Sequence, residues 1–191
     1  MPSPGTGDLA GVDAVSATSA WTVGEASLGS TQKTLILRWN GTNWSQVASP
    51  APGVDSALGA VTATSAGNAW AVGAFFTGTA GKTLILHWNG TTWVQTPSPN
   101  PSGPVTEMTL TGVAATSASN AWAVGTYNTG TSQQTIIVRW NGTAWKQVAS
   151  PSPGSSASFL RGVAATSVGN VWAVGNFSNG GPSQVFAIHC C

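Results

Sequence analysis

Charged side chains are scarce in this sequence: Asp, Glu, Lys and Arg make up 6% of its 191 residues, against about a quarter in an ordinary soluble domain. With six Lys and Arg and a net charge of +1, the chain lacks the clustered cations that phosphate backbones require. This argues against a nucleic-acid partner. The surface must instead be covered by Ser, Thr, Asn, Gln and Gly, which favours an extracellular or cell-surface setting.

Cysteine and long apolar runs are equally scarce. The two cysteines, Cys190 and Cys191, are neighbours, and because a disulfide between adjacent residues is strained, we expect no structural bridge. No segment approaches the roughly 20 apolar residues that cross a bilayer, so no membrane span is expected. The amino-terminal MPSPGTGDLAG has neither a basic start nor an apolar run, and we expect no signal peptide in it.

The most prominent feature of the sequence is an internal repeat of about fifty residues. The phrases AWTVG, AWAVG, AWAVG and VWAVG place Trp21, Trp70, Trp122 and Trp172 at intervals of 49, 52 and 50 residues. A leucine stands twelve residues before each of these tryptophans, and segments such as TLILRWNGTNW follow the first three of them. Self-similarity at this period predicts a repeat architecture.

Each repeat is predicted to form four short antiparallel strands. The third is rich in β-branched residues, and the fourth, such as WSQVASP, ends at a proline that cannot continue a ladder. No window shows a helical period, so the fold class is all-β, and four-stranded units in series predict a β-propeller. The repeats span about residues 9–57, 58–109, 110–159 and 160–191, the last incomplete, within a single propeller domain or propeller fragment covering 1–191.

The ten tryptophans fall on three positions of the repeat, and we expect them to be structural. The Asn-Gly step favours a tight turn between the third and fourth strands, so Trp39 and Trp44 should emerge on the same face of a hairpin. Each indole is expected to pack against the neighbouring repeat rather than to stack on a sugar. The set is Trp21, Trp39, Trp44, Trp70, Trp88, Trp93, Trp122, Trp140, Trp145 and Trp172.

One position of the third strand carries a basic residue in every repeat: Arg38, His87, Arg139 and His189. These side chains could form a ring that holds an anionic ligand, or each could stack on a tryptophan of its own or the next repeat. We favour stacking, because a position fixed within a strand is set by packing first. Together with Tyr127, the one tyrosine, they make up a candidate ligand rim.

The order of these segments resembles the kelch repeat of kelch and galactose-oxidase-type propellers: a WAVG strand, a polar loop, a strand ending in a turn, and a tryptophan before a proline-containing exit. The NGTxW hairpin also resembles the Asp-box turn of sialidase-like propellers. The resemblance covers nearly the whole chain and implies a propeller fold. It is not complete, because a single glycine replaces the kelch double glycine and Asn40, Asn89 and Asn141 replace the aspartate.

Catalysis is not expected of this chain. Sialidases, which the turn resembles, use an arginine triad, a tyrosine nucleophile and acidic partners, whereas Arg38 and Arg139 here share one repeat position. A galactose-oxidase-like copper site needs Tyr and His ligands together. One tyrosine and two histidines at equivalent repeat positions are a poor set of ligands for such a site. No two carboxylates share an obvious site. We predict no enzyme, no cofactor and no metal; the alternative is a fragment of a larger propeller enzyme whose catalytic residues lie in other blades.

The predicted function is therefore a binding or scaffold propeller that recognises a glycan or a protein. The contact surface should be the loops between the second and third strands, predicted at 26–33, 75–82, 127–134 and 177–184, because they vary while the frame stays constant. The PSPG at 2–5 matches the exit PSPG at 151–154, so neither end supplies the missing fourth strand. We expect a free edge, and hence further blades or a homo-oligomer of two chains with about eight blades.

Overall fold

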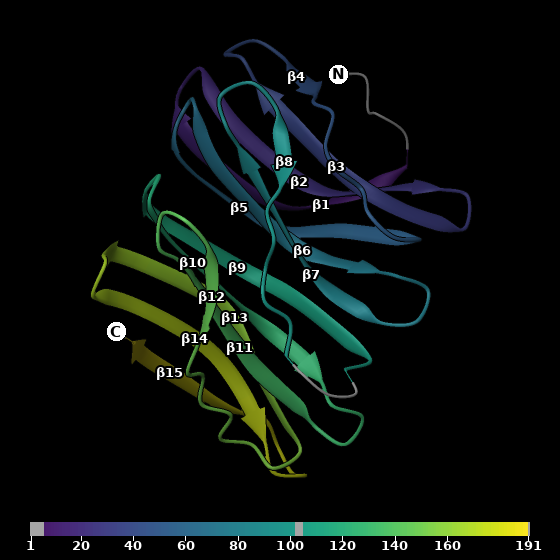
Figure 1. Cartoon of the computed structure of the whole chain (residues 1–191), viewed down its shortest axis with the longest axis vertical. Helices are drawn as coiled ribbons and strands as arrows, with labels where there is room; N and C mark the ends of the chain where they lie inside the picture. The colour runs from purple at the N-terminus through teal and green to yellow at the C-terminus, as the bar shows by residue number, and fades with distance from the viewer. Residues whose placement is uncertain (1–5, 102–104, 191) are drawn as a thin grey trace.

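Antiparallel β-strands make up all the regular structure that a computed structural model shows for residues 6–101 and 105–190. There are fifteen strands and no helix in this part of the chain, which confirms the all-β prediction. The strands form four consecutive groups, named sheets 1 to 4, that follow one another along the chain (Figure 1).

Sheets 1 to 3 each contain four strands in chain order, and sheet 4 contains three. Sheet 1 contains β1 (Gly7–Ser16), β2 (Ser19–Leu28), β3 (Thr31–Trp39) and β4 (Trp44–Gln46). Sheet 2 contains β5 (Asp55–Ser65), β6 (Asn68–Phe76), β7 (Gly81–Trp88) and β8 (Trp93–Gln95). Sheet 3 contains β9 (Glu107–Ser117), β10 (Asn120–Asn128), β11 (Gln133–Trp140) and β12 (Trp145–Val148). Sheet 4 contains β13 (Ala157–Ser167), β14 (Asn170–Ser178) and β15 (Gln184–Cys190). One parallel pair, Gln133 with Ala157, joins sheets 3 and 4.

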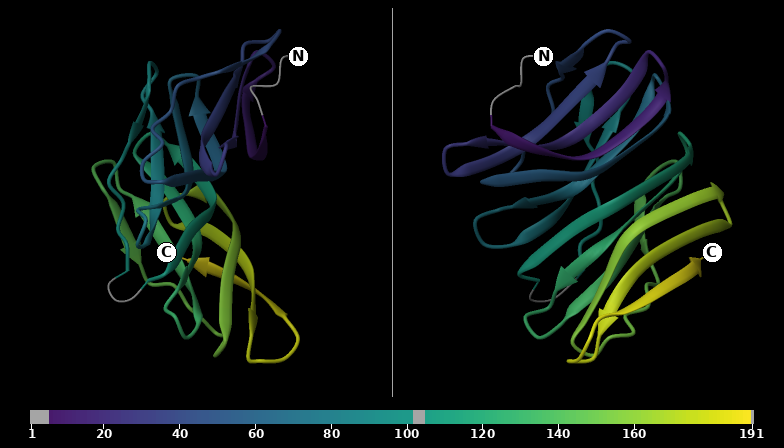
Figure 2. Two further views of the ribbon diagram at one scale, coloured as in Figure 1. Left: turned by 90° about the vertical axis from the view of Figure 1, so that its right-hand side faces the viewer. Right: turned by 180° about the vertical axis from the view of Figure 1, so that it is seen from behind.

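The four sheets lie side by side in a curved row. Their first strands are in contact in chain order, β1 with β5, β5 with β9 and β9 with β13. Sheet 1 and sheet 4 lie at opposite ends of the long axis (Figures 1 and 2). The repeats are therefore propeller-like, and within the described residues they form an open arc. The PSPG segment at residues 2–5, on which the expectation of a free edge is based, lies outside the described residues.

An apolar cluster holds each pair of successive sheets together. Side chains two residues apart on a strand point to the same face, so Trp21 and Val23 both face sheet 2 and pack with Leu58 and Val61 of β5. Corresponding residues form the clusters between sheets 2 and 3 and between sheets 3 and 4. A fully buried tryptophan such as Trp21 stabilises its junction by at most about 4 to 6 kcal/mol on area arithmetic.

The glycine that ends each WAVG phrase lies against the backbone of the first strand. A Cβ at Gly24 would overlap the carbonyl oxygen of Asp8, and one at Gly73 would overlap that of Ala57. The register of each first strand shifts beside this contact, which is where the two backbones approach most closely. The same contact occurs at Gly125 and Gly175.

The connections between second and third strands are shorter than the sequence predicts. The eight-residue loops expected at 26–33, 75–82, 127–134 and 177–184 are turns at 29–30, 77–80, 129–132 and 179–183. Pairing continues into the predicted loops, for example between Ala26 and Lys33 and between Tyr127 and Gln134. A glycine with positive φ in each turn, such as Gly29 at 66°, lets the chain reverse in little space.

The Asn-Gly hairpin forms as predicted, with four residues in its turn. The Asn40 N–H donates to the carbonyl of Asn43 at 3.3 Å, and the Asn40 Oδ1 accepts the N–H groups of Thr42 and Asn43, each at 2.9 Å. Trp39 and Trp44 are directly opposite one another, with ring centroids 5.6 Å apart. The two indoles therefore lie on the same face of the hairpin.

Candidate functional site

The arginines of the candidate rim lie over tryptophans. Arg38 pairs across the strands with Trp21, and its guanidinium carbon lies 5.1 Å from that ring and 5.5 Å from the ring of Trp88 in sheet 2. Arg139 pairs with Trp122 and lies 5.1 Å from its ring. The cations thus contribute cation–π contacts at the junctions between sheets, which is the stacking arrangement that the sequence favours.

The histidines of the rim occupy the same register position and stack in the same way. His87 lies 4.1 Å from the ring of Trp70 with the planes 22° apart, and its Nε2 is 2.7 Å from the Asn68 Oδ1. Burial lowers the pKa of His87, which favours the neutral imidazole. A corresponding group at the exposed face of sheet 4 consists of His189, Trp172 and Asn170.

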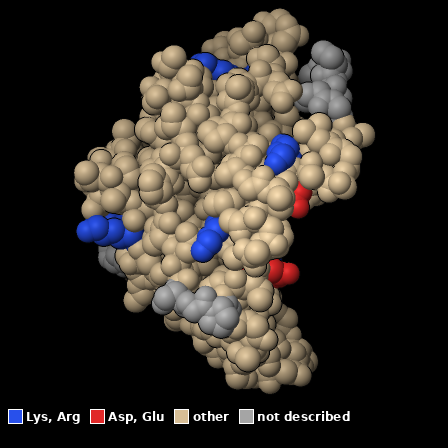
Figure 3. All heavy atoms as spheres, turned by 45° about the vertical axis from the view of Figure 1, so that its right-hand side comes forward, with Lys and Arg blue, Asp and Glu red and all other residues tan. Residues whose placement is uncertain are grey.

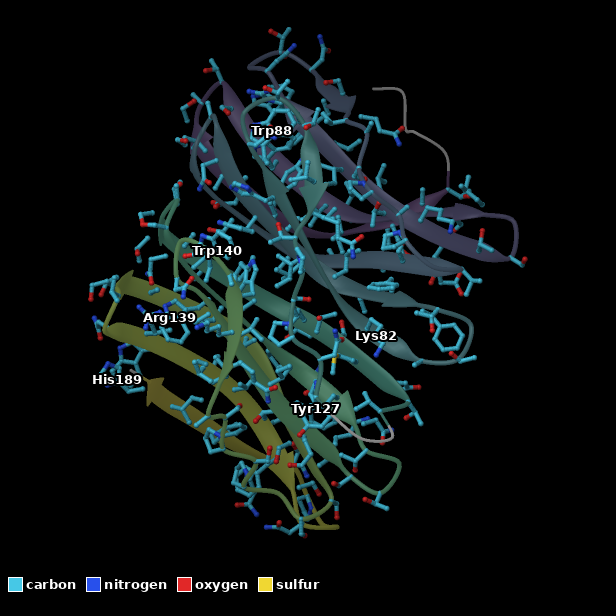
Figure 4. The ribbon with its side chains drawn as sticks, viewed as in Figure 1. Lys82, Trp88, Tyr127, Arg139, Trp140 and His189 are labelled. Atoms are coloured by element: carbon cyan, nitrogen blue, oxygen red, sulfur yellow. The ribbon has the colours of Figure 1, made fainter. Side chains whose placement is uncertain are left out.

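Tyr127 does not join the other rim residues. It pairs with Gln134, five positions along β10 from the Trp122–Arg139 pair, a separation of roughly 17 Å at the usual rise of a strand. Figure 4 shows Tyr127 near the β10–β11 turn and Arg139 and His189 toward the other end of the strands. The five-residue rim expected from the sequence is therefore wrong for Tyr127.

Most of the tryptophans pack between sheets. Trp21 lies 4.9 Å from Trp88 and 5.1 Å from Trp93, the second contact being edge-to-face. The same contacts join Trp70 to Trp140 and Trp145 in sheet 3. Edge-to-face and tilted indoles of this kind add to the burial energy of the junction.

Three tryptophans depart from the prediction that every indole packs on a neighbouring repeat. Trp39 and Trp44 contact one another and are only partly buried, and Trp172 is 51% exposed. All three belong to the two end sheets of the row, where no described sheet covers the outer face. The exposure of Trp44 and Trp172 is a consequence of position in the row, because their counterparts in the other sheets have similar local sequences and are buried. Trp140, a counterpart of Trp39, is itself partly buried.

A groove of about 510 Å³ opens at the edge of the molecule that carries the turns between second and third strands. Its apolar floor comes from the β6–β7 hairpin and from the starts of β5 and β9, and comprises Ala57, Ala74, Phe75, Phe76 and Met108. Its polar rim comprises Gln32, Asp55, Ser56, Thr79, Thr106 and Glu107. The hydroxyl of Ser56 is buried there and has no hydrogen-bond partner among the described residues.

Negative charge gathers along this edge. Asp55 and Glu107 lie at the groove, and Asp8 and Glu25 lie on the neighbouring β1 and β2. Desolvation, with the negative charges of Asp8 and Asp55, raises the pKa of Glu25. The Lys33 ammonium is held by the carbonyls of residues 53 and 54, each at 3.0 Å. Figure 3 shows acidic side chains at the border where these turns lie.

The sequence predicts a contact surface at the edge that carries the turns between second and third strands, but it does not predict the groove. The predicted loops include Phe75 and Phe76, whereas Glu107 and Met108 lie on β9 of the next sheet and carry no local motif. The available signal was the Phe75–Phe76 pair itself, because the corresponding positions in sheet 1 are Ala26 and Ser27.

The described residues contain neither a metal-binding cluster nor a membrane-spanning helix. Within 6–101 and 105–190, no three His, Cys, Asp or Glu side chains are grouped closely enough to hold a metal ion. That part of the chain also has no helix with the length and apolar character of a membrane span. Cys191 lies outside the described residues.

Comparisons with known proteins give a structural likeness and no family assignment. No protein-family model matches the chain. No curated protein matches it. Among solved structures, the chain is similar to one from the structure of YCF48 bound to D1 peptide, with a TM-score of 0.47 and 17% sequence identity over 95% of this chain and 64% of that chain. This chain thus spans less than two thirds of the length of that neighbour.

Proposed function

We propose that this chain is a non-catalytic binding module, that its four sheets are blades of a propeller, and that it recognises an extended segment of a protein. The groove between sheets 2 and 3 is the observation that carries this proposal. Its lining comes from positions that differ among the repeats, while the tryptophan frame beneath stays constant. Recognition by variable positions on a rigid scaffold is the usual arrangement of binding proteins.

The chemistry of the groove suits an apolar side chain that is flanked by a basic residue. Phe76 is partly exposed and Met108 is buried, and both line the groove, which gives the floor an apolar surface. Asp55 and Glu107 supply negative charge at the rim, where a Lys or Arg of the ligand would be attracted.

Binding suits the described lining residues better than catalysis does. No histidine is among them, so the lining has no imidazole to activate Ser56 as a nucleophile, and the Ser56 hydroxyl is itself buried. The Asp55 Oδ1 already accepts the backbone N–H of Gln32 at 2.9 Å. We also propose a role without a cofactor, and an extracellular or cell-surface setting remains a prediction from the low charge.

A glycan is the second candidate ligand. The partly exposed ring of Phe76 beside the carboxylate of Asp55 offers an apolar face next to a hydrogen-bond acceptor, and sugars use both kinds of contact. We favour the protein ligand because the rim carries two carboxylates and four of the five acidic residues of the chain lie along this edge.

The test presents the 191-residue chain to a phage-displayed random peptide library and to a glycan array. Phe76→Ala and Glu107→Gln change the groove, and Val94→Ala is the control, since Val94 is exposed on β8 and does not line the groove. We expect enrichment of peptides that combine an apolar and a basic residue. Their affinity should fall about tenfold or more for Phe76→Ala and stay unchanged for Val94→Ala.

Three results would overturn the proposal in different ways. Selected peptides that bind wild type and Phe76→Ala with equal affinity would show that the groove is not the binding site. Enrichment on the glycan array alone would assign the groove to a sugar. Cleavage of an arrayed glycan or a displayed peptide would show that the chain is an enzyme.

A further inference from the structure

The outer face of sheet 4 exposes side chains that are buried at the junctions between sheets. Trp172 is 51% exposed and Val174 is 50% exposed. Both lie on β14, two residues apart, and so point to the same face. The corresponding tryptophans and valines of the other sheets are fully buried, namely Trp21, Trp70, Trp122, Val23, Val72 and Val124.

The outer face of sheet 1 shows the opposite half of the same pattern. Leu9 is 53% exposed and Val12 is 68% exposed on β1, and the Trp39–Trp44 hairpin beside them is partly buried. The corresponding residues of sheets 2 and 3 pack against the preceding sheet. Trp140 is partly buried there, and the others are buried, namely Leu58, Val61, Trp88, Trp93, Leu110, Val113 and Trp145. Ala20, Leu35 and Leu37 of sheet 1 are already buried, so its open surface is β1 and the hairpin.

The two outer faces are complementary halves of one junction. Between sheets 1 and 2, the tryptophan and valine of β2 pack on the leucine and valine of β5 and on the tryptophan hairpin of sheet 2. The face of sheet 4 presents the tryptophan and valine, and the face of sheet 1 presents the leucine, valine and hairpin. The outer face of sheet 1 therefore carries the residue types that pack on a face like that of sheet 4 at the internal junctions.

A hollow in the face of sheet 4 adds room for a docked sheet. It measures about 510 Å³ and is lined in part by Val174, Phe186 and Ala187. Ala187 occupies the register position that Ile36, Ile85 and Ile137 occupy in the other sheets. Those isoleucines belong to the junction clusters, so the hollow lies where a neighbouring sheet packs at the internal junctions.

We propose that the Trp172 face of one chain binds the β1 and Trp39–Trp44 face of a second copy, head to tail. The interface reproduces the internal junctions, including the contact of a β2-type tryptophan with a tryptophan hairpin. Because the two surfaces differ, the contact is heterologous, and it either closes into a ring or adds further copies. This proposal is independent of the groove and of its ligand.

The first test is the mass of the 191-residue chain by sedimentation velocity and native mass spectrometry from about 1 to about 100 µM. We expect dimers or larger assemblies that grow with concentration, and Trp172→Ala should be monomeric across the range. Val168→Ala is the matched control, since Val168 is also 51% exposed but lies in the turn before β14. A wild-type chain that is monomeric at the highest concentration would overturn the proposal.

The second test distinguishes head-to-tail docking from contact between like faces. Val12→Glu places a charge on the face of sheet 1, and Trp172→Ala removes the anchor of the other face. Each variant alone should be monomeric, whereas an equimolar mixture should form a heterodimer through the one intact pair of faces. Self-association of Val12→Glu, or a mixture that stays monomeric while both variants keep the wild-type circular dichroism spectrum, would contradict the head-to-tail arrangement.

Discussion

Trp70 and His87 face one another across β6 and β7 with ring centroids 4.1 Å apart, while the His87 Nε2 lies 2.7 Å from the Asn68 Oδ1. The same register position holds Arg38 in sheet 1 and Arg139 in sheet 3. One site of the repeat therefore accepts either a permanent cation over an indole or a stacked imidazole whose pKa is lowered by burial. This difference gives sheet 2 a pH response that sheets 1 and 3 lack at this site.

The lowered pKa of His87 predicts a loss of stability in mild acid. Above the ordinary pKa of about 6.5 the ring is neutral in the folded and the unfolded chain. As the pH falls from there toward the lowered folded pKa, the unfolded chain binds the proton more readily, so the free energy of unfolding falls. His87→Arg removes this titration and supplies the residue of the neighbouring sheets.

The measurement compares the melting temperatures of wild type and His87→Arg at about pH 7.5 and about pH 5.5. The wild type should lose more stability between the two, and titration of all other groups is common to both proteins. An equal loss in the two proteins would show that His87 is not the responsible group.

Burial predicts different costs for two tryptophans in the same sequence phrase. Trp21→Ala should lower the free energy of unfolding by about 3 to 5 kcal/mol, because it opens a cavity among Trp88, Trp93 and Val61. Trp172→Ala should cost about 1 to 2 kcal/mol, since half of the ring is already in water. Urea denaturation at low protein concentration measures both, and equal costs would contradict the junction assignment.

Local features of the fold could be predicted from the sequence because they depend on a few neighbouring residues. The Asn-Gly step determines the hairpin, and alternation along the strand then places Trp39 and Trp44 on one face. The register of the neighbouring β2–β3 hairpin places Arg38 opposite Trp21. Stacking of the cation on the indole follows from this pairing without any long-range information.

Features that depend on the whole row of sheets could not be predicted in this way. Trp122 and Trp172 stand in nearly the same phrase, yet the first is fully buried and the second is half exposed. The difference arises because sheet 4 covers Trp122 and no described sheet covers Trp172. The groove was missed for a similar reason, since it joins Phe76 to Glu107, which belong to different sheets.

The close approach of strands predicts that Gly73 is not replaceable. A Cβ there would overlap the backbone carbonyl of Ala57, which is held in the β5 ladder and cannot move as a side chain could. Gly73→Ala should therefore cost at least about 2 kcal/mol. Gly181→Ala is the control, since a Cβ at Gly181 meets nothing and its φ is not in the left-handed region. It should change stability by no more than about 0.5 kcal/mol, and urea midpoints that fall equally would contradict the packing account.

The side chain of Asn141 predicts a specific role for the third Asn-Gly turn. Its Oδ1 accepts the N–H groups of Thr143 at 3.0 Å and Ala144 at 2.9 Å, so Asn141→Ala leaves both donors to water and should cost about 1 kcal/mol. Asn141→Asp keeps an acceptor at the same place and, when ionised, binds the two donors more strongly. Its stability at neutral pH should equal or exceed that of wild type and should decline as the carboxylate is protonated below about pH 4. Thermal melts of the three proteins at both pH values measure this order. An aspartate variant as unstable at neutral pH as the alanine variant would show that the amide N–H₂, and not the Oδ1, stabilises the turn.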